Sequence, residues 1–172
     1  MTARIHEFLR HRREEGPCVV VDLEVVRDNY TAFARSMPDT RVFYAVKANP
    51  DPAILSLLAS LGSCFDTASV AEVETALAAG AEPDRISFGN TIKKERDIAR
   101  AFERGVRLFA VDCTAEVEKI ARAAPGAQVF CRILCDGAGA EWPLSRKFGC
   151  APEMAGRVLE HAHRLGLVAY GL

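Results

Sequence analysis

Short runs of β-branched and aromatic residues alternate along this chain with longer segments of helical periodicity. The strand-like runs lie at 42–48, 63–68, 85–90, 107–112, 127–134 and 166–172. The helical segments between them lie at 52–61, 69–80, 92–104, 114–124 and 152–165, with Ser69 and Thr114 as expected N-caps. Because these β-α units recur roughly every 20–25 residues, the pattern predicts a parallel sheet with helices outside it.

Three further elements are expected before the first of these units. A helix at 3–14 ends at Gly16-Pro17, and a strand at 18–23 (CVVVDL) leads into a helix at 24–37. The strand-like runs are apolar on both faces, which is typical of strands covered on both sides.

Two ways of closing such a sheet fit the pattern: an open doubly wound sheet or a (β/α)8 barrel. A barrel of this type usually needs about 250 residues. The chain has 172 residues, offers six barrel-type strands at most and stops inside the last one. We therefore expect residues 1–172 to be a single domain that forms the front part of something larger.

Composition excludes several classes of function. The 22 basic and 23 acidic residues give a net charge of −1, which offers no electrostatic footprint for nucleic acid or an anionic membrane. The charged first residues lack the apolar core of a secretion signal, and no apolar run approaches the ~20 residues of a membrane span. A cytoplasmic protein is expected.

The cysteines and histidines indicate neither a disulfide framework nor a metal site. None of the six cysteines forms a C-x-x-C pair, so we expect buried, reduced thiols. His161 and His163 stand two apart on a predicted helix, about 200° around its axis, and do not share a face.

Lys47 is the most informative candidate for chemistry. It stands at the carboxyl end of a strand, in FYAVKANP, where α/β folds bind their ligands. A lysine held against apolar walls loses its proton more easily, and its amine becomes a nucleophile suited to an aldehyde cofactor. The alternative is a lysine that extends from the strand end into solvent.

Charged residues near other strand ends could complete such a site. Asp66 ends the next strand in SCFDTAS, Glu72 follows in the helix after it, and Arg132 lies within VFCRIL. An aspartate and an arginine that point into a barrel are expected to pair, because an unpaired buried charge is costly. This pair could orient a lysine or a cofactor ring, or it could be a structural ion pair remote from any ligand.

Three other positions leave both a site role and a structural role open. Gly89-Asn90 and Asp112 could line the mouth of a barrel or serve as turn and capping residues. Lys147, in SRKFGC, follows a Gly-rich connection at 135–151 that lacks the order of a nucleotide-binding loop.

Three stretches of the sequence resemble a known family. The run FYAVKANPDPAILSLLASLGSCFDTASVAEVE at 43–74 resembles the fold type III pyridoxal-phosphate (PLP) amino-acid decarboxylases, whose fold is shared by alanine racemase. Residues 87–121 and 130–150 resemble the ornithine/lysine branch, in particular bacterial ornithine decarboxylases. The similarity extends over 17–172 and implies the N-terminal half to two-thirds of an alanine racemase-like (β/α)8 TIM-type barrel, incomplete in this chain.

The resemblance also implies roles for individual residues. Lys47 matches the lysine that bonds to PLP, and Asp66 and Arg132 match residues near the cofactor. Glu72 matches an acidic residue of the same helix, and Lys147 matches a position associated with the active site across a dimer interface. The implied activity is decarboxylation of a basic L-amino acid, most simply L-ornithine to putrescine, by a homodimer.

Several family features have no match in these 172 residues. The resemblance places a histidine motif, a Gly-rich phosphate loop, a glutamate at the pyridine nitrogen and a C-terminal β domain further along the family's sequence. A second function therefore remains open: a non-catalytic PLP-binding or decarboxylase-regulating protein that pairs with a full-length homologue.

Overall fold

The computed structural model describes residues 1–135, 137, 139, 141 and 147–172. Six strands pair in parallel and in chain order. They are β1 (Phe43–Ala45), β2 (Cys64–Thr67), β3 (Ile86–Phe88), β4 (Leu108–Val111), β5 (Gln128–Cys131) and β6 (Val168–Gly171). The predicted parallel sheet is confirmed. Each connection places the next strand directly beside the one before it, in the same direction.

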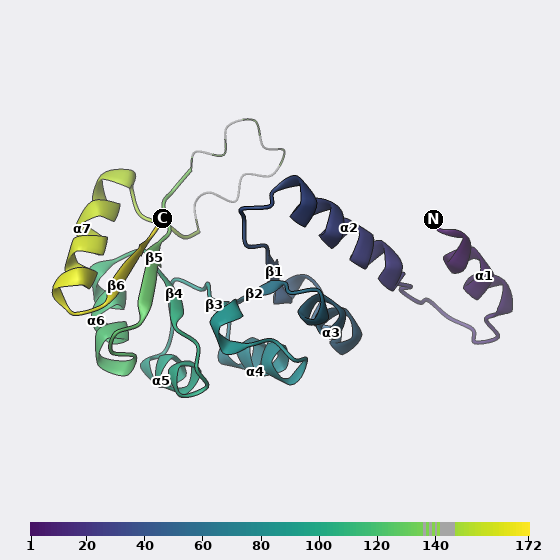
Figure 1. The fold of residues 1–172 in the computed structure, drawn as a ribbon, viewed down its shortest axis with the longest axis horizontal. Coiled ribbons are helices and arrows are strands. Elements are labelled where there is room, and N and C mark those ends of the chain that lie inside the picture. The colour runs from purple at the N-terminus through teal and green to yellow at the C-terminus, as the bar shows by residue number, and fades with distance from the viewer. Residues whose placement is uncertain (136, 138, 140, 142–146) are drawn as a thin grey trace.

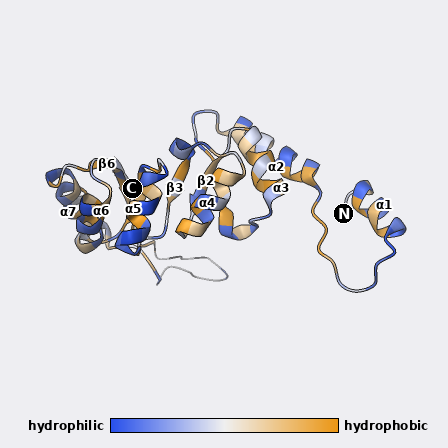
Figure 2. Ribbon diagram, turned by 90° about the horizontal axis from the view of Figure 1, so that it is seen from below, coloured by the Kyte–Doolittle hydropathy of each residue, from blue (hydrophilic) through white to orange (hydrophobic). Residues whose placement is uncertain are grey.

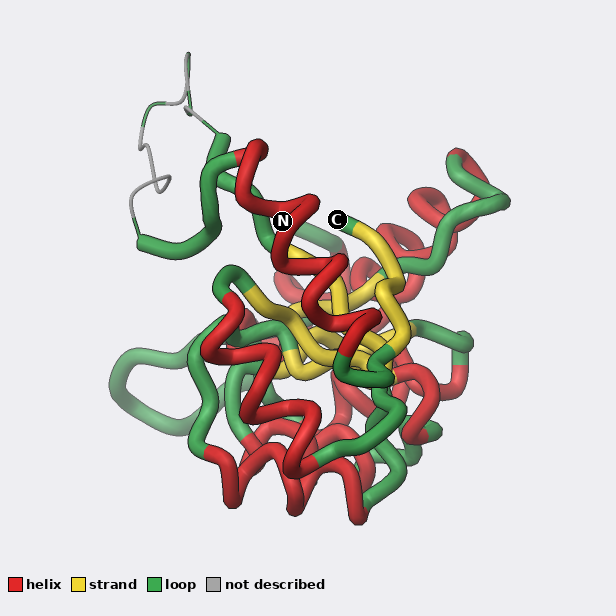
Figure 3. Tube along the Cα trace, turned by 90° about the vertical axis from the view of Figure 1, so that its left-hand side faces the viewer, coloured by secondary structure: helices red, strands yellow, loops and turns green. Residues whose placement is uncertain are grey.

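The helices occupy the segments between the strands. They are α1 (Ala3–His11), α2 (Leu23–Ser36), α3 (Pro52–Ser60), α4 (Val70–Ala78), α5 (Glu95–Glu103), α6 (Thr114–Ala123) and α7 (Pro152–Arg164). Short 3-10 turns, η1 (Val46–Ala48) and η2 (Pro83–Arg85), adjoin β1 and β3. Figure 1 shows α3 to α7 following the row of strands along one side, and Figure 3 shows the strands gathered above most of the helices. None of the described helices is long and apolar enough to cross a membrane.

The two faces of the sheet differ in burial. On the helix-covered face, Phe65, Ile86, Phe109 and Val129 are 0–1% exposed and form the centre of the hydrophobic core. On the opposite face, residues such as Phe43, Asp66 and Phe130 are only half-buried. The expectation that both faces are covered therefore holds only in part: helices cover one face and leave a hollow on the other.

The strand expected at 18–23 is wrong. Residues 18–22 form no strand, and Leu23 already belongs to α2. Val19 is 93% exposed, and no described strand pairs with this segment. A β-branched run favours a strand only when a neighbouring strand supplies hydrogen bonds and packing, and this segment has none in the part of the chain the structure describes.

Asp22 joins the N-terminal helix to the start of α2. It accepts a 2.6 Å hydrogen bond from Thr2 Oγ1 and pairs with Arg4, while its Oδ1 also accepts from the Glu24 backbone N–H and caps α2. The hydrogen bonds from Thr2 and then Arg4 hold the pKa of this carboxyl below its usual value. Figure 2 shows the segment around α1 lying apart from the strands. The hydrogen bonds of Asp22 connect this segment to the start of α2.

Helix starts follow local hydrogen bonding. Ser69 caps α4 as expected, because its hydroxyl accepts from the Glu72 N–H at 3.2 Å. Thr114, expected as a cap, is instead the first helical residue of α6, and Cys113 precedes it without a capping hydrogen bond. The difference is one residue, which is the usual uncertainty of a sequence-based boundary.

Removal of the Phe109 side chain tests whether the core lies under the helix-covered face. Phe109 is fully buried and its ring lies 6.2 Å from that of Phe88. We expect Phe109→Ala to lower the free energy of unfolding by about 3–5 kcal/mol, measured by urea denaturation. The matched control is Phe33→Ala on α2, where the side chain is 52% exposed and the change should stay near 0.5 kcal/mol. Equal losses for the two variants would contradict this core.

Candidate functional site

A cavity of about 870 Å³ lies on the half-buried face of the sheet, within the size range of cofactor sites. Residues from all six strands and from the turns that follow them line it: Phe43, Ala45, Lys47, Asp66, Ser87, Gly89, Leu108, Phe130, Cys131, Arg132, Ile133, Tyr170 and Leu172. Its charged members stand at or just after strand carboxyl ends. The cavity therefore occupies the position at which parallel α/β sheets bind ligands.

Lys47 lies on η1, the 3-10 turn that follows β1. The turn divides its residues between core and cavity: Val46 is fully buried, and the next residue, Lys47, lines the cavity. The strand predicted at 42–48 therefore ends earlier, at Ala45. The Lys47 side chain is exposed, so the apolar enclosure expected for its amine is not formed by the described residues.

Asp66 lies on β2 on the same wall of the cavity as Lys47, and Ala45 and Asp66 are register partners. Ser87 Oγ donates a 2.9 Å hydrogen bond to Asp66 Oδ1. Burial raises the pKa of the Asp66 carboxyl, and nearby Glu72 adds to this effect; the Ser87 hydrogen bond and the charges of Lys47 and Arg132 oppose it. Asp66 is therefore a carboxyl group partly withdrawn from water beside an amine.

The turn after β3 closes over the Asp66 carboxyl group. A Cβ at Gly89 would lie 1.9 Å from Asp66 Oδ1, so the carboxyl group fits there only because Gly89 has no side chain. Gly89 donates its backbone N–H to Thr67 O at 2.8 Å, which holds the turn against β2. Of the two roles open for Gly89, turn residue or cavity residue, both are found in the structure.

Arg132 follows β5 and is exposed rather than lying within a strand. The expected ion pair with Asp66 is absent between these two described residues, and Arg132 acts on Asp66 only at longer range. Its guanidinium lies instead 5.5 Å from the centre of the Phe148 ring, and Lys147 Nζ lies 5.2 Å from the same ring. Two cations thus share one aromatic contact at the rim of the cavity.

Gly149 fixes the motif Lys147-Phe148-Gly149 beside Arg132. Its N–H donates to Asp112 Oδ2 at 3.0 Å, and a Cβ there would meet the backbone of Ile133 at 2.9 Å. Cys150 then continues as a bridge partner of Ile133. This anchor has no signal in the local sequence, since the contact between Asp112 and Gly149 joins residues far apart in the chain. Residues 136, 138, 140 and 142–146 of the predicted Gly-rich connection lie outside the described residues.

Glu72 acts as a helix cap in this structure. Its Oε2 accepts from the Ala68 N–H at 2.8 Å, while its own N–H bonds to Ser69. This reciprocal arrangement resembles a capping box and fixes the turn that follows Asp66. Glu72 is thus near the cavity without lining it.

Cys131 lines the cavity as a neutral thiol. Burial and the neighbouring Cys150 raise the pKa of Cys131 to about 12, and the two sulfur atoms lie 3.5 Å apart. A protonated buried thiol is a poor nucleophile, so Cys131 contributes surface to the cavity rather than an attacking group. Of the six cysteines, Cys64, Cys131 and Cys150 are buried as expected, Cys113 is half-buried, and Cys18 and Cys135 are exposed.

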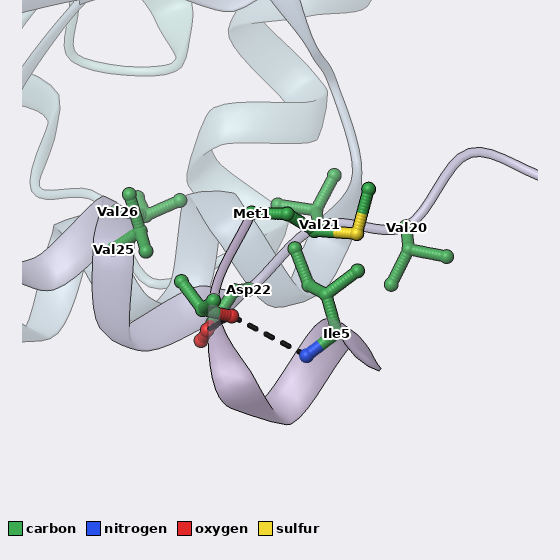
Figure 4. A pocket seen from close by; sticks show the side chains of 8 residues that line it. Met1, Ile5, Val20, Val21, Asp22, Val25 and Val26 are labelled. Atoms are coloured by element: carbon green, nitrogen blue, oxygen red, sulfur yellow. Dashed lines mark hydrogen bonds between the residues drawn. The ribbon is translucent and has the colours of Figure 1, made fainter. Parts of the chain in front are cut away.

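A second, smaller cavity lies at the N-terminus and is mainly apolar. Met1, Ile5, Val20, Val21, Val25 and Val26 surround Asp22 there (Figure 4). The Asp22 carboxylate already accepts hydrogen bonds from Thr2 and Arg4. We therefore assign this cavity to the packing of α1 against the segment before α2.

Comparison with known proteins identifies the family. The pyridoxal-binding domain of the pyridoxal-dependent decarboxylases matches residues 23–172. The chain belongs to this family. Its fold is the N-terminal barrel portion of such decarboxylases, and PLP is the cofactor of this domain.

Two relatives and one further structure show how far the similarity extends. The lysine/ornithine decarboxylase of Selenomonas ruminantium is 40% identical over 94% of this chain and 41% of its own length. The lysine decarboxylase of that organism, solved with PLP and cadaverine, has a TM-score of 0.86 at 37% identity and covers 99% of this chain and 42% of its own. The arginine decarboxylase of Paramecium bursaria Chlorella virus has a TM-score of 0.90 at 28% identity, over 99% and 47%. The decarboxylase domain described here therefore spans less than half the length of these relatives.

The residues of the large cavity fit PLP. An aldehyde requires a primary amine, which Lys47 provides, and an anionic group requires a cation, which Arg132 provides. Leu108 and Phe130 supply apolar surface against which a ring could pack. The chemistry of this set of side chains is thus consistent with the cofactor of the family.

Replacement of Asp66 tests its position in the cavity. Because the folded-state pKa of this acid is raised, the folded protein binds the proton more tightly, and stability falls as pH rises from about 3.9 through the raised value. Asp66→Asn removes this penalty, so we expect it to melt above the parent at pH 7 and to lose that advantage as pH falls below about 4. Thermal unfolding of both proteins across this pH range measures the difference.

The matched control for this experiment is the exposed Asp84. Asp84→Asn removes an exposed carboxylate, and its difference from the parent gives the background expected for loss of a surface charge. A constant difference for Asp66→Asn, or a more stable parent at pH 7, would contradict the burial described for Asp66.

Proposed function

We propose that residues 1–172 are the PLP-binding N-terminal portion of a decarboxylase that converts L-ornithine to putrescine. They would supply the first half to two-thirds of its barrel. The observation that carries the proposal is that one cavity, at the carboxyl ends of the parallel strands, brings together Lys47, Asp66 and Arg132. The proposal extends to the setting expected from the sequence, a cytoplasmic homodimer in polyamine biosynthesis.

Lys47 holds the cofactor in this proposal. Its exposed amine at the cavity wall would be the group that bonds to the cofactor aldehyde. When bound, PLP supplies an electron sink for the bond that breaks as carbon dioxide leaves.

Asp66 and Arg132 orient groups around that amine. Asp66 is a partly desolvated carboxyl with a raised pKa, and such a group accepts a proton more readily near neutral pH than an exposed aspartate does. Arg132 carries a permanent charge, and its guanidinium lies 5.5 Å from the centre of the Phe148 ring. Arg132 would attract an anionic group of the cofactor, and Asp66 would orient the cofactor or the amine of Lys47.

Glu72 and Lys147 act at the edge of the site. Glu72 fixes the turn that follows Asp66, and through this turn it sets the direction of the carboxyl group. Lys147 is exposed beside Arg132 and Phe148, a place from which it could reach a partner protomer.

The choice of ornithine rests on the resemblance of residues 87–121 and 130–150 and on the names of relatives. The Selenomonas protein is a lysine/ornithine decarboxylase, and an ornithine decarboxylase of Nicotiana glutinosa is 41% identical over 92% of this chain and 37% of its own length. The identities to these two relatives, 40% and 41%, are nearly equal, so ornithine and lysine have to be compared directly as substrates.

Covalent capture tests cofactor binding by this chain. The purified protein is incubated with PLP, reduced with borohydride, digested and mapped by peptide mass. We expect one major adduct, on the peptide that contains Lys47, and its loss in Lys47→Ala. Lys94→Ala, which removes an exposed lysine before α5, should retain the adduct. Labelling scattered over surface lysines and unchanged by Lys47→Ala would contradict the proposed site.

The same preparation distinguishes an enzyme from a non-catalytic PLP-binding protein. Release of carbon dioxide is measured with ornithine, lysine and arginine, both for this chain and for the longest form of the protein that its reading frame encodes. The proposal predicts turnover by the longest form, fastest with ornithine and lost in Lys47→Ala. Capture at Lys47 without turnover by any form would favour the regulatory alternative.

A further inference from the structure

Lys93 forms a buried charged cluster with Glu116 and Lys119, outside the residues that line the large cavity. The Lys93 side chain is 0% exposed and that of Glu116 is 3% exposed. Lys93 Nζ lies 3.0 Å from Glu116 Oε1, and Lys119 Nζ lies 2.5 Å from Glu116 Oε2. Such a cluster is costly to bury, so its contacts need an explanation beyond the ion pairs.

The three protons of the Lys93 ammonium group all have acceptors. Besides Glu116, Nζ donates to the backbone oxygen of Asn90 at 2.7 Å and to that of Ala110 at 2.6 Å. Asn90 belongs to the turn after β3, and Ala110 belongs to β4. One buried cation thus connects the β3–α5 turn to the neighbouring strand.

Glu116 and Lys119 hold the same turn from α6. Glu116 Oε1 accepts from the Lys93 backbone N–H at 3.1 Å, and Lys119 Nζ donates to the Lys93 backbone oxygen at 2.6 Å. Both backbone polar groups of Lys93 are therefore bonded to side chains of one helix. The position of this turn is determined by charged side chains rather than by apolar packing alone.

The turn held in this way is the one that touches Asp66. Gly89 directly precedes Asn90, packs against the Asp66 carboxyl group and donates its N–H to Thr67 O. Asn90 Nδ2 also donates to Ala68 O at 3.4 Å, next to the end of β2. A continuous series of hydrogen bonds runs from α6 through Lys93 to the surroundings of Asp66.

We propose that Lys93 is a positioning residue for the site: it fixes the Gly89–Asn90 turn against Asp66 from behind the cavity. The consequence of this inference for the cofactor site rests on the proposed function, in which Asp66 aligns the cofactor. The effect of Lys93 on the turn does not rest on it, because the contact between Gly89 and Asp66 exists without any ligand.

The test removes the two charges of the buried pair and keeps the backbone hydrogen bond that Glu116 makes. Lys93→Met alone leaves Glu116 with a lost partner and could unfold the protein, so the second variant is Lys93→Met/Glu116→Gln. In it neither charge is left buried, and the glutamine oxygen can still accept from the backbone N–H of residue 93. The matched control is Lys94→Met, since Lys94 is the next residue, is exposed and makes no capping hydrogen bond through its side chain.

Hydrogen exchange at the Gly89 amide is the first readout. We expect it to become about tenfold faster or more in the folded double variant, while amides in the core of β5 change far less, because only the turn loses its anchor. The Lys94→Met control should exchange like the parent. Unchanged Gly89 exchange in the folded double variant would overturn the proposal.

The titration of Asp66, followed by the NMR shift of its carboxyl carbon, is the second readout. The charged groups that act on it, Lys47, Glu72 and Arg132, are the same in all variants. If the turn loosens, water reaches the carboxyl group and the pKa of Asp66 falls towards its ordinary value. A purely structural cluster would leave that pKa in place while lowering overall stability, and this result would also overturn the proposal.

A measurement on the unsubstituted protein covers the case in which both variants fail to fold. The Gly89 and Lys93 amides belong to the same anchored turn, so native-state exchange should open them together, with equal protection. Protection of Lys93 that far exceeds that of Gly89 would contradict the inference. None of these readouts uses PLP, so failure of capture at Lys47 would reject the proposed function and leave this inference to be judged separately.

Discussion

Parallel pairing of six strands in chain order is the constraint on which the site depends. Register pairs such as Ala45 with Asp66 and Asp66 with Ser87 align neighbouring strands so that their carboxyl ends fall at one edge. Every turn that follows a strand then lies at that edge, whatever its own sequence. Residues 85 positions apart, Lys47 and Arg132, come to line one cavity as a result of backbone hydrogen bonding.

The unequal faces of the sheet explain the chemistry of the cavity. Helices α3 to α7 bury one face, where Phe65 and Phe109 are fully enclosed. The other face remains half-buried, and this partial burial is enough to raise the pKa of Asp66 while Lys47 stays accessible. The buried cluster around Lys93 then holds the turn that defines the environment of Asp66, so a charge outside the cavity contributes to the geometry inside it.

Periodicity was sufficient to predict the sheet, the helices behind it and the end of the sheet at which Lys47 and Asp66 stand. Local pattern failed where a tertiary partner decides the outcome. Val19, Val20 and Val21 are strand-forming residues, but no described strand lies beside them. Arg132 lies against the Phe148 ring instead of pairing with Asp66. The contact between Asp112 and Gly149 and the burial of Lys93 could not be predicted either, because each depends on residues brought together only by the folded sheet. The roles of Lys47, Asp66, Arg132, Glu72 and Lys147 stay predictions; the first three residues line one cavity, and the other two lie outside its lining.

The most direct test of this account is an NMR titration of the 15N-labelled chain with PLP, which maps the edge of the sheet that the cofactor meets. The account predicts that amide shifts change at the carboxyl edge, at Lys47, Gly89 and Arg132. Residues at the amino edge, such as Gly62, Arg85 and Arg107, should keep their positions. Changes confined to the amino edge, or spread over the surface without the carboxyl edge, would contradict the claim that parallel strand pairing builds the cofactor site in this chain.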